Sequence, residues 1–198
     1  MILTKANLRR AALAHRQALP TAEIAHRSQQ LSDLLFQHFP VAEWRWLHVF
    51  LPIAARNEPD TWRIIRRVWA EGLAARLAVP VVPAAGGLLR HYELRPETPL
   101  HLNRWGIPEP ESEENAETEV AASAFDAVLV PLLAVDATGH RVGYGAGYYD
   151  RFLAQCRPTT LFIGLSVLTD APVPRIADVH SGDVLLTAYL TPGGLRWF

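Results

Sequence analysis

The chain of 198 residues has one cysteine, one lysine and no long apolar run. A single cysteine excludes an internal disulfide framework and is typical of a reducing compartment. Cys156 belongs to no paired motif, so we interpret it as a packing residue and not as a catalytic thiol. No stretch reaches the roughly 20 apolar residues of a membrane-spanning helix, and the charged start MILTKANLRR lacks the apolar segment of a signal peptide. We therefore expect a soluble, cytoplasmic protein without a membrane partner.

A strong net charge is also missing, because 19 basic residues nearly balance 20 acidic ones. This balance argues against a broad nucleic-acid-binding surface but allows a local basic pocket. Lys5 is the single lysine among the basic residues. It was either retained for its chemistry or left by chance in an arginine-rich composition, and the composition alone leaves both explanations open.

The hydrophobic pattern predicts helices that alternate with strands. Helices are expected at 4–19, 21–38, 61–72 and 148–156, and strands at 46–51, 75–83, 88–94, 125–135, 160–165 and 184–190. Thr4 and Thr21 are candidate helix caps, and the prolines of 75–83 indicate strand ends or an edge strand. The most apolar run, FDAVLVPLLAV at 125–135, predicts a central strand.

This alternation predicts an α/β fold with a mainly parallel, twisted sheet and helices on both faces, which is a Rossmann-like open sheet. The length suits a single domain over residues 1–198. Residues 95–120 fit no periodic pattern, and their acidic part at 111–119 is either a solvated loop or a functional acidic site. The oligomeric state does not follow from the sequence, although a monomer is favoured.

The stretch GHRVGYGAGYYDRFL, residues 139–153, follows the expected central strand and leads into an expected helix. Ligands of open α/β sheets bind at such positions, beyond the carboxyl ends of strands. Alternating glycines let backbone N–H groups approach a phosphate at a helix start. Arg141 adds a fixed cation, and Asp150 adds a carboxylate for a hard metal such as Mg²⁺.

Taken alone, these glycines are equally compatible with a tight turn whose tyrosines only pack. The stretch is not a Walker A loop, since no G-K-[ST] ends it, and its spacing differs from the dinucleotide-binding pattern. The residues themselves therefore predict no more than an anion-binding loop.

The same stretch resembles the signature G-x-R-L-G-x-G-x-G-[YF]-Y-D-R-x-L of the 5-formyltetrahydrofolate cyclo-ligase family, with Val142 in place of the usual leucine. Four shorter matches occur in family order: Lys5, Leu8 and Arg9; Glu58, Asp60 and Thr61; Gly106 to Pro110; and Val130-Pro131 to Asp136. The resemblance implies an enzyme that uses ATP and Mg²⁺ to convert 5-formyltetrahydrofolate into 5,10-methenyltetrahydrofolate. In that reaction the formyl oxygen is phosphorylated, N10 attacks the activated carbon, and phosphate leaves.

By resemblance, Lys5 and Arg9, four residues apart on one helical face, contact the ATP phosphates. The rest of the implied ATP site is the run Arg141, Val142, Gly143, Tyr144, Gly145, Ala146, Gly147, Tyr148 and Tyr149. The implied folate site consists of Ile53, Glu58, Trp105, Tyr144, Gly145, Ala146, Gly147 and Tyr148. Asp150 and Asp183 are the implied Mg²⁺ ligands. Alternative roles are a helix start for Glu58 and core packing for Trp105.

The C-terminal part departs from the family pattern. An aspartate is absent directly after His180, where Ser181 stands, and Ala188 replaces the usual glutamate. Asp178 is a candidate replacement for the missing acid, at a different spacing. These departures affect the substrate more than the reaction class, so an ATP-dependent enzyme with another substrate is one alternative. A folate- or nucleotide-binding protein without catalysis is a second, against which the retained Lys5, Arg141, Asp150 and Asp183 speak.

Overall fold

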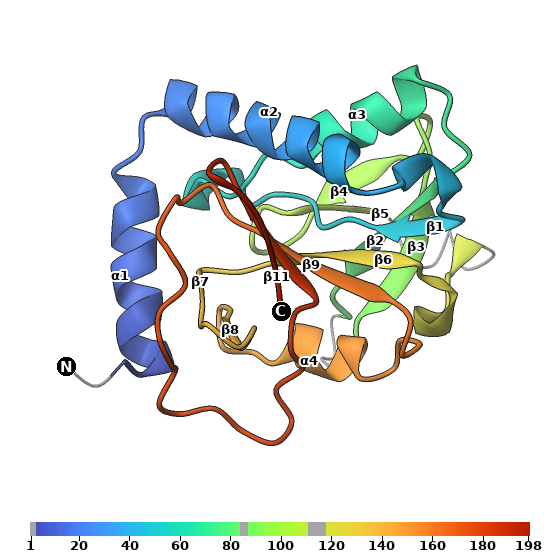
Figure 1. Ribbon diagram of the computed structural model, residues 1–198. Coiled ribbons are helices and arrows are strands. Elements are labelled where there is room, and N and C mark those ends of the chain that lie inside the picture. Colours follow the sequence, from blue (N-terminus) through green and yellow to red (C-terminus); the bar gives the residue numbers. More distant parts are fainter. Residues whose placement is uncertain (1–2, 84–86, 111–117) are drawn as a thin grey trace.

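The computed structural model describes residues 3–83, 87–110 and 118–198, and its centre is a seven-stranded sheet (Figure 1). The strand order is β11 (Gly194–Trp197), β10 (Ala188–Thr191), β9 (Leu161–Leu165), β6 (Ala127–Pro131), β1 (Trp46–His48), β2 (Arg76–Val81) and β3 (Arg90–Leu94). The strands from β10 to β2 are mutually parallel, whereas the edge strands β3 and β11 are antiparallel to their neighbours. The prediction of a mainly parallel sheet is confirmed.

Helices cover both faces of this sheet, as expected. On one face α2 (Thr21–His38) and α3 (Trp62–Ala70) bury Leu31, Leu35 and Ile65 against the strands. On the other face α4 (Tyr148–Leu153) buries Phe152 and Leu153. The first helix, α1 (Lys5–Gln17), stands at one end of the sheet beside β7 and β8 (Figure 1). Its N-cap is Thr4, whose side chain accepts the Asn7 N–H at 3.3 Å, as predicted.

The apolar run 125–135 does contain the central strand, but it is not one strand. It splits into β6 and the short β7 (Ala134–Val135), which pairs with β8 (Arg141–Val142) in a separate hairpin. The run leaves the sheet after Pro131, and the buried carboxylate of Asp136 then shapes the turn between β7 and β8, because it accepts the backbone N–H groups of Thr138 and His140. The same carboxylate accepts the Ile176 N–H and ties this hairpin to the C-terminal loop.

Other boundaries also differ from the prediction. The cap of α2 is Pro20, and Thr21 is its first helical residue. Pro80 lies inside β2, which is not an edge strand. Proline is tolerated there because β1 ends opposite Ala78, so that no hydrogen bond to β1 is lost at Pro80. Helix α4 ends at Leu153, three residues early, and β10 starts at Ala188.

Four of the described strands were not predicted, and β8 of the hairpin above is one of them. A hairpin of β4 (Leu100–Leu102) and β5 (Pro108–Pro110) forms within the stretch 95–120, and β11 follows β10 through a tight turn. Most of the acidic stretch 111–119 lies outside the described residues. Glu119, which is described, pairs with Arg90 at 2.5 Å. Among the described helices, none is long and apolar enough to cross a bilayer.

Cys156 packs among apolar side chains beside α4, and burial raises the pKa of its thiol to about 12. A thiol in that state is a poor nucleophile, which agrees with the packing role expected from the sequence.

Two buried histidines face each other on the sheet. The rings of His48 on β1 and His91 on β3 are 5.0 Å apart and pack against Phe125 and Phe152. Burial lowers the pKa of His48 well below its usual value, and burial lowers the pKa of His91 to about 4. Both side chains are therefore neutral in the folded protein at neutral pH.

The histidine pair makes the stability of the fold sensitive to mild acid. Below pH 6.5 the unfolded chain binds protons at both histidines and the folded chain does not, so stability is complete above that pH and falls as the pH decreases. At pH 5 we expect His91 to account for a loss of about 2 kcal/mol in the free energy of unfolding, and His48 to add a loss in the same direction. Urea denaturation at several pH values between 7 and 5 measures this change in the free energy of unfolding.

His91→Phe should remove the His91 part of this pH dependence and leave that of His48, whereas the exposed His26→Gln on α2 is the matched control and should not reduce it. If the free energy of unfolding depends on pH equally in His91→Phe and in the parent chain, His91 is not a source of the acid sensitivity.

Candidate active site

A cavity of about 450 Å³ opens at the carboxyl ends of the parallel strands. Phe50 and Leu51 follow β1, Val82 follows β2, and Pro131 ends β6, and all four residues line it. Further parts of the wall come from α1, from the connection between β8 and α4, from the loop with Ile53 and Glu58, and from the C-terminal loop with His180 and Asp183. Its place and volume are those of a small-molecule site in an open α/β sheet.

The glycine-rich loop between β8 and α4 is shaped to let α1 approach it. Gly145 has a φ of +103° and Gly147, the N-cap of α4, has a φ of +68°, both in the region that favours glycine. Arg9 donates from Nε to the carbonyl oxygen of Gly143 at 2.8 Å. A Cβ at Gly145 would lie 3.2 Å from the Arg9 guanidinium, so a side chain there would press against it.

Arg141 connects three segments at the base of the cavity. Its buried guanidinium donates to Asp150 Oδ1 on α4 at 2.9 Å and to the carbonyl oxygen of Val184 in the C-terminal loop. The Val184 N–H donates back to the same Asp150 oxygen at 3.1 Å. Burial lowers the pKa of Arg141, while the charge of Asp150 opposes that effect.

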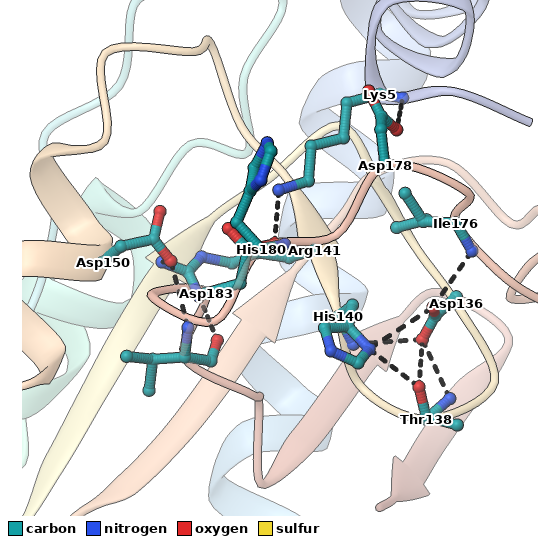
Figure 2. A network of polar contacts seen from close by, with 11 residues as sticks. Lys5, Asp136, Thr138, His140, Arg141, Asp150, Ile176, Asp178, His180 and Asp183 are labelled. Carbon is teal, nitrogen blue, oxygen red and sulfur yellow. Dashed lines mark hydrogen bonds and ion pairs between the residues drawn. The ribbon is translucent and has the colours of Figure 1, made fainter.

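Lys5 makes the equivalent link from α1. Its ammonium pairs with Asp183, and its backbone N–H donates to Asp178 Oδ1 at 2.6 Å. Figure 2 shows Lys5 and Arg141 directed toward Asp183 and Asp150, respectively. Partial burial would raise the pKa of Asp183, but the Lys5 ammonium and the His180 N–H lower it below its usual value. Asp178 therefore holds the start of α1 and does not replace the missing acid beside Asp183.

On another part of the wall, Glu58 is buried in a network of donors. Its carboxylate accepts the Ile53 N–H at 2.7 Å and the Tyr144 hydroxyl at 2.5 Å. Tyr144 in turn accepts a hydrogen bond from Arg16 of α1. Burial raises the pKa of Glu58, opposed by these donors and by the charges of Arg16 and Arg56. Glu58 is thus a cavity acid and not only a helix start.

The cavity therefore has two chemical regions. One has cations beside the partly buried carboxylates of Asp150 and Asp183, and the other has the buried carboxylate of Glu58 among apolar walls. The model of the 5-formyltetrahydrofolate cyclo-ligase family matches residues 2–185. The chain belongs to the 5-formyltetrahydrofolate cyclo-ligase family. The resemblance seen in the signature stretch is confirmed, and the protein is an enzyme of that class.

Relatives in this family match nearly the whole chain. The 5-formyltetrahydrofolate cyclo-ligase of Escherichia coli K12 is 30% identical over 179 residues, which cover 89% of this chain and 94% of the relative. That of Mycolicibacterium smegmatis is 31% identical over 194 residues, covering 96% and 94%. The NMR structure of Aquifex aeolicus 5,10-methenyltetrahydrofolate synthetase superposes with a TM-score of 0.80 at 25% identity and covers 98% of this chain and 92% of the other. The fold is thus that of solved members.

Among the residues expected at the cyclo-ligase site, Val142 and Trp105 do not line the cavity. Val142 is fully buried because β8 pairs with β7 at that position. Trp105 lies in the turn between β4 and β5, is 41% exposed, and borders a separate hollow that adjoins the cavity at Val82 and Glu109. The structure places the other expected residues together around the cavity: Lys5, Arg9, Ile53, Glu58, Arg141, Gly143, Tyr144, Gly145, Ala146, Gly147, Tyr148, Tyr149, Asp150 and Asp183.

Three residues near the cavity were not assigned a role from the sequence. Arg16 is 3% exposed and holds Tyr144; its spacing of seven from Arg9, on the same helical stripe, was the available signal. Glu109 lines the cavity and accepts the Val82 N–H at 3.2 Å, and burial raises its pKa. It stands in the Gly106–Pro110 segment that carried part of the resemblance. His180 also lines the cavity, although the hydrogen bond it donates to Asp183 comes from its backbone.

Within residues 3–83, 87–110 and 118–198, no cluster of three or more histidine, cysteine, aspartate or glutamate side chains could hold a metal by itself. Asp150 and Asp183 are two carboxylates at one cavity, next to cations that suit phosphate. Magnesium is commonly bound by one or two carboxylates together with substrate phosphates and water. This pair fits a magnesium ion that arrives with a nucleotide, but not an all-protein metal cage.

Proposed function

We propose that the protein converts 5-formyltetrahydrofolate into 5,10-methenyltetrahydrofolate at the expense of ATP, with Mg²⁺, and releases ADP and phosphate. Family membership supports the reaction class. The observation that carries the proposal is the single cavity, where Lys5, Arg9 and Arg141 lie near the buried acid Glu58. Such a cavity can hold an anionic and a heterocyclic reactant with their reacting ends together.

Glu58 would bind the folate heterocycle. Its carboxylate is an acceptor, which suits the ring N–H groups of the pterin. The Ile53 N–H and the Tyr144 hydroxyl fix its orientation, and Phe50, Leu51 and Val82 supply apolar wall for a planar ring. Since burial raises the pKa of Glu58, binding a donor-rich ring there relieves the cost of the buried charge.

The phosphates of ATP would lie along the glycine-rich loop, where Gly143, Gly145 and Gly147 leave stretches of backbone without side chains and cations stand nearby. Lys5 and Arg9 come from one face of α1, and Arg141 comes from the base of the loop. Asp150 and Asp183 would hold Mg²⁺, whose chemistry is to neutralise charge on the phosphates. Alignment of donor and acceptor is the main task of the protein in such a transfer.

In the proposed reaction the formyl oxygen attacks the γ-phosphorus and ADP leaves. N10 then attacks the activated carbon, and the carbon–oxygen bond breaks as phosphate departs. Phosphorylation is needed because an amide-like oxygen is otherwise a poor leaving group. We propose that one domain of residues 1–198 does this in the cytoplasm, on a small-molecule substrate and without nucleic acid or membrane.

An absorbance assay tests the function. Purified protein with 5-formyltetrahydrofolate, ATP and Mg²⁺ should develop the near-ultraviolet absorbance of the methenyl product, and omission of ATP or chelation of Mg²⁺ should abolish it. Folate binding without product would indicate a binding protein. ATP turnover stimulated by a different amide or carboxylate, with no methenyl product, would indicate another substrate.

Asp150→Asn tests the metal assignment. The substitution keeps size and one acceptor but removes the charge that Mg²⁺ and Arg141 share. We expect turnover to fall by on the order of 100-fold, while the Kd for 5-formyltetrahydrofolate stays within about threefold. Steady-state kinetics and calorimetry measure the two effects.

The matched control is Asp33→Asn. It removes the same charge from an exposed ion pair between Asp33 on α2 and Arg67 on α3, and it should change neither turnover nor the Kd for 5-formyltetrahydrofolate. Equal losses of turnover and folate affinity in Asp150→Asn would argue against a metal role.

A further inference from the structure

Tyr149, the second residue of α4, has a buried hydroxyl with no hydrogen-bond partner in the part of the chain that the structure describes. Its ring is held in place by His48, at 6.1 Å between centroids, and by Phe152, at 6.0 Å. An unpaired buried hydroxyl is unfavourable, because it gives up its hydrogen bonds to water without replacement. The arrangement therefore needs an explanation other than packing, for which phenylalanine would serve.

Tyr149 also lines the cavity, and this separates it from the other unpaired groups. Within residues 3–83, 87–110 and 118–198, no other buried side-chain nitrogen or oxygen without a partner belongs to a residue that lines this cavity. The main polar groups of the wall are already paired: Glu58 with Tyr144, Lys5 with Asp183, and Arg141 with Asp150. Tyr149 thus lines the cavity and carries a fixed donor that has no partner among the described residues.

The hydroxyl lies within electrostatic reach of both regions of the cavity. Burial raises the pKa of Tyr149 far above neutrality; the charge of Glu58 raises it further and that of Arg141 opposes it. The group therefore stays protonated and can donate. In the chain Tyr149 stands between Tyr144, which holds Glu58 at the proposed folate end, and Asp150, which holds Arg141 at the proposed phosphate end, and all of them line the one cavity.

We propose that Tyr149 is a catalytic residue that donates a hydrogen bond to the formyl oxygen of the substrate throughout the reaction. The inference rests on the proposed function and adds a specific donor to it. One oxygen atom is involved at every stage, since the formyl oxygen becomes the oxygen that joins carbon to phosphorus and finally leaves with phosphate.

The donor contributes most when the carbon–oxygen bond breaks. First a lone pair of the formyl oxygen forms the bond to the γ-phosphorus, and the bond to ADP breaks. N10 then bonds to the carbon and its proton passes to the phosphate. The electron pair of the carbon–oxygen bond goes to the departing oxygen, where a fixed donor stabilises the growing negative charge. The Tyr149 proton stays on tyrosine.

Tyr149→Phe tests the proposal, because it removes the hydroxyl and keeps the ring. We expect kcat in the absorbance assay to fall by about 100-fold, with the KM for ATP and for 5-formyltetrahydrofolate within about threefold. The Tm should be equal or higher, since the lost hydroxyl had no partner. A kcat within about twofold of the parent enzyme, or a lower Tm with activity lost only in proportion to unfolding, would overturn it.

Two further variants give the comparison. Tyr144→Phe should lower the Tm, because Glu58 and Arg16 each lose a hydrogen bond. Tyr189→Phe removes a buried hydroxyl beside a separate hollow and should leave kcat unchanged. If the parent protein forms no methenyl product, the proposed function fails; if it does and Tyr149→Phe matches it, only this inference fails.

Discussion

The site depends on one buried cation. Arg141 holds Asp150 of α4 and the carbonyl oxygen of Val184 at the same time, so a hairpin, a helix and the C-terminal loop are fixed around a single guanidinium. A buried charge is tolerated only when its partners are complete, and removing one partner leaves the other uncompensated. The positions of Asp150 and of the glycine-rich loop before it are therefore consequences of this contact.

A second set of contacts brings the N-terminal helix to the same place. Asp136 binds the Ile176 N–H, the next residue donates its N–H to the Leu3 carbonyl oxygen at 2.9 Å, and Asp178 accepts the Lys5 N–H (Figure 2). The C-terminal loop is thus held at Asp136 and at Arg141, and it holds the start of α1 in turn. Lys5 reaches Asp183 because of that chain of contacts, although 178 positions separate them.

The sequence predicted the elements that have one strong periodic pattern. Helix α2 and strands β6 and β9 fall within the expected ranges, because an element with a continuous buried face has a regular hydrophobic pattern in its sequence. The hairpin β7–β8 could not be predicted, because the bend depends on the Asp136 carboxylate and on Ile176, 40 positions away. Strand β11 was missed because its four residues include exposed ones and lie at the sheet edge, where neither alternation nor burial is strong.

The candidate site could be assembled from the signature stretch and the family resemblance, and the cavity contains most of those residues. What the resemblance could not supply is the pairing: Arg16 with Tyr144, Asp178 with the helix start, and the lack of a partner for Tyr149. Those relations depend on side-chain directions in three dimensions. Trp105 shows that the resemblance also predicted too much. It stands directly before a matched motif, yet it lines the neighbouring hollow and not the cavity.

Simultaneous binding of both reactants is the most direct test of a shared cavity. Calorimetry of the protein saturated with Mg²⁺ and a non-hydrolysable ATP analogue should give one 5-formyltetrahydrofolate per chain. In the same experiment, Glu58→Gln should weaken folate binding by about tenfold and leave the affinity for the analogue unchanged. Displacement of folate by the analogue, or equal weakening of both ligands by Glu58→Gln, would contradict the account.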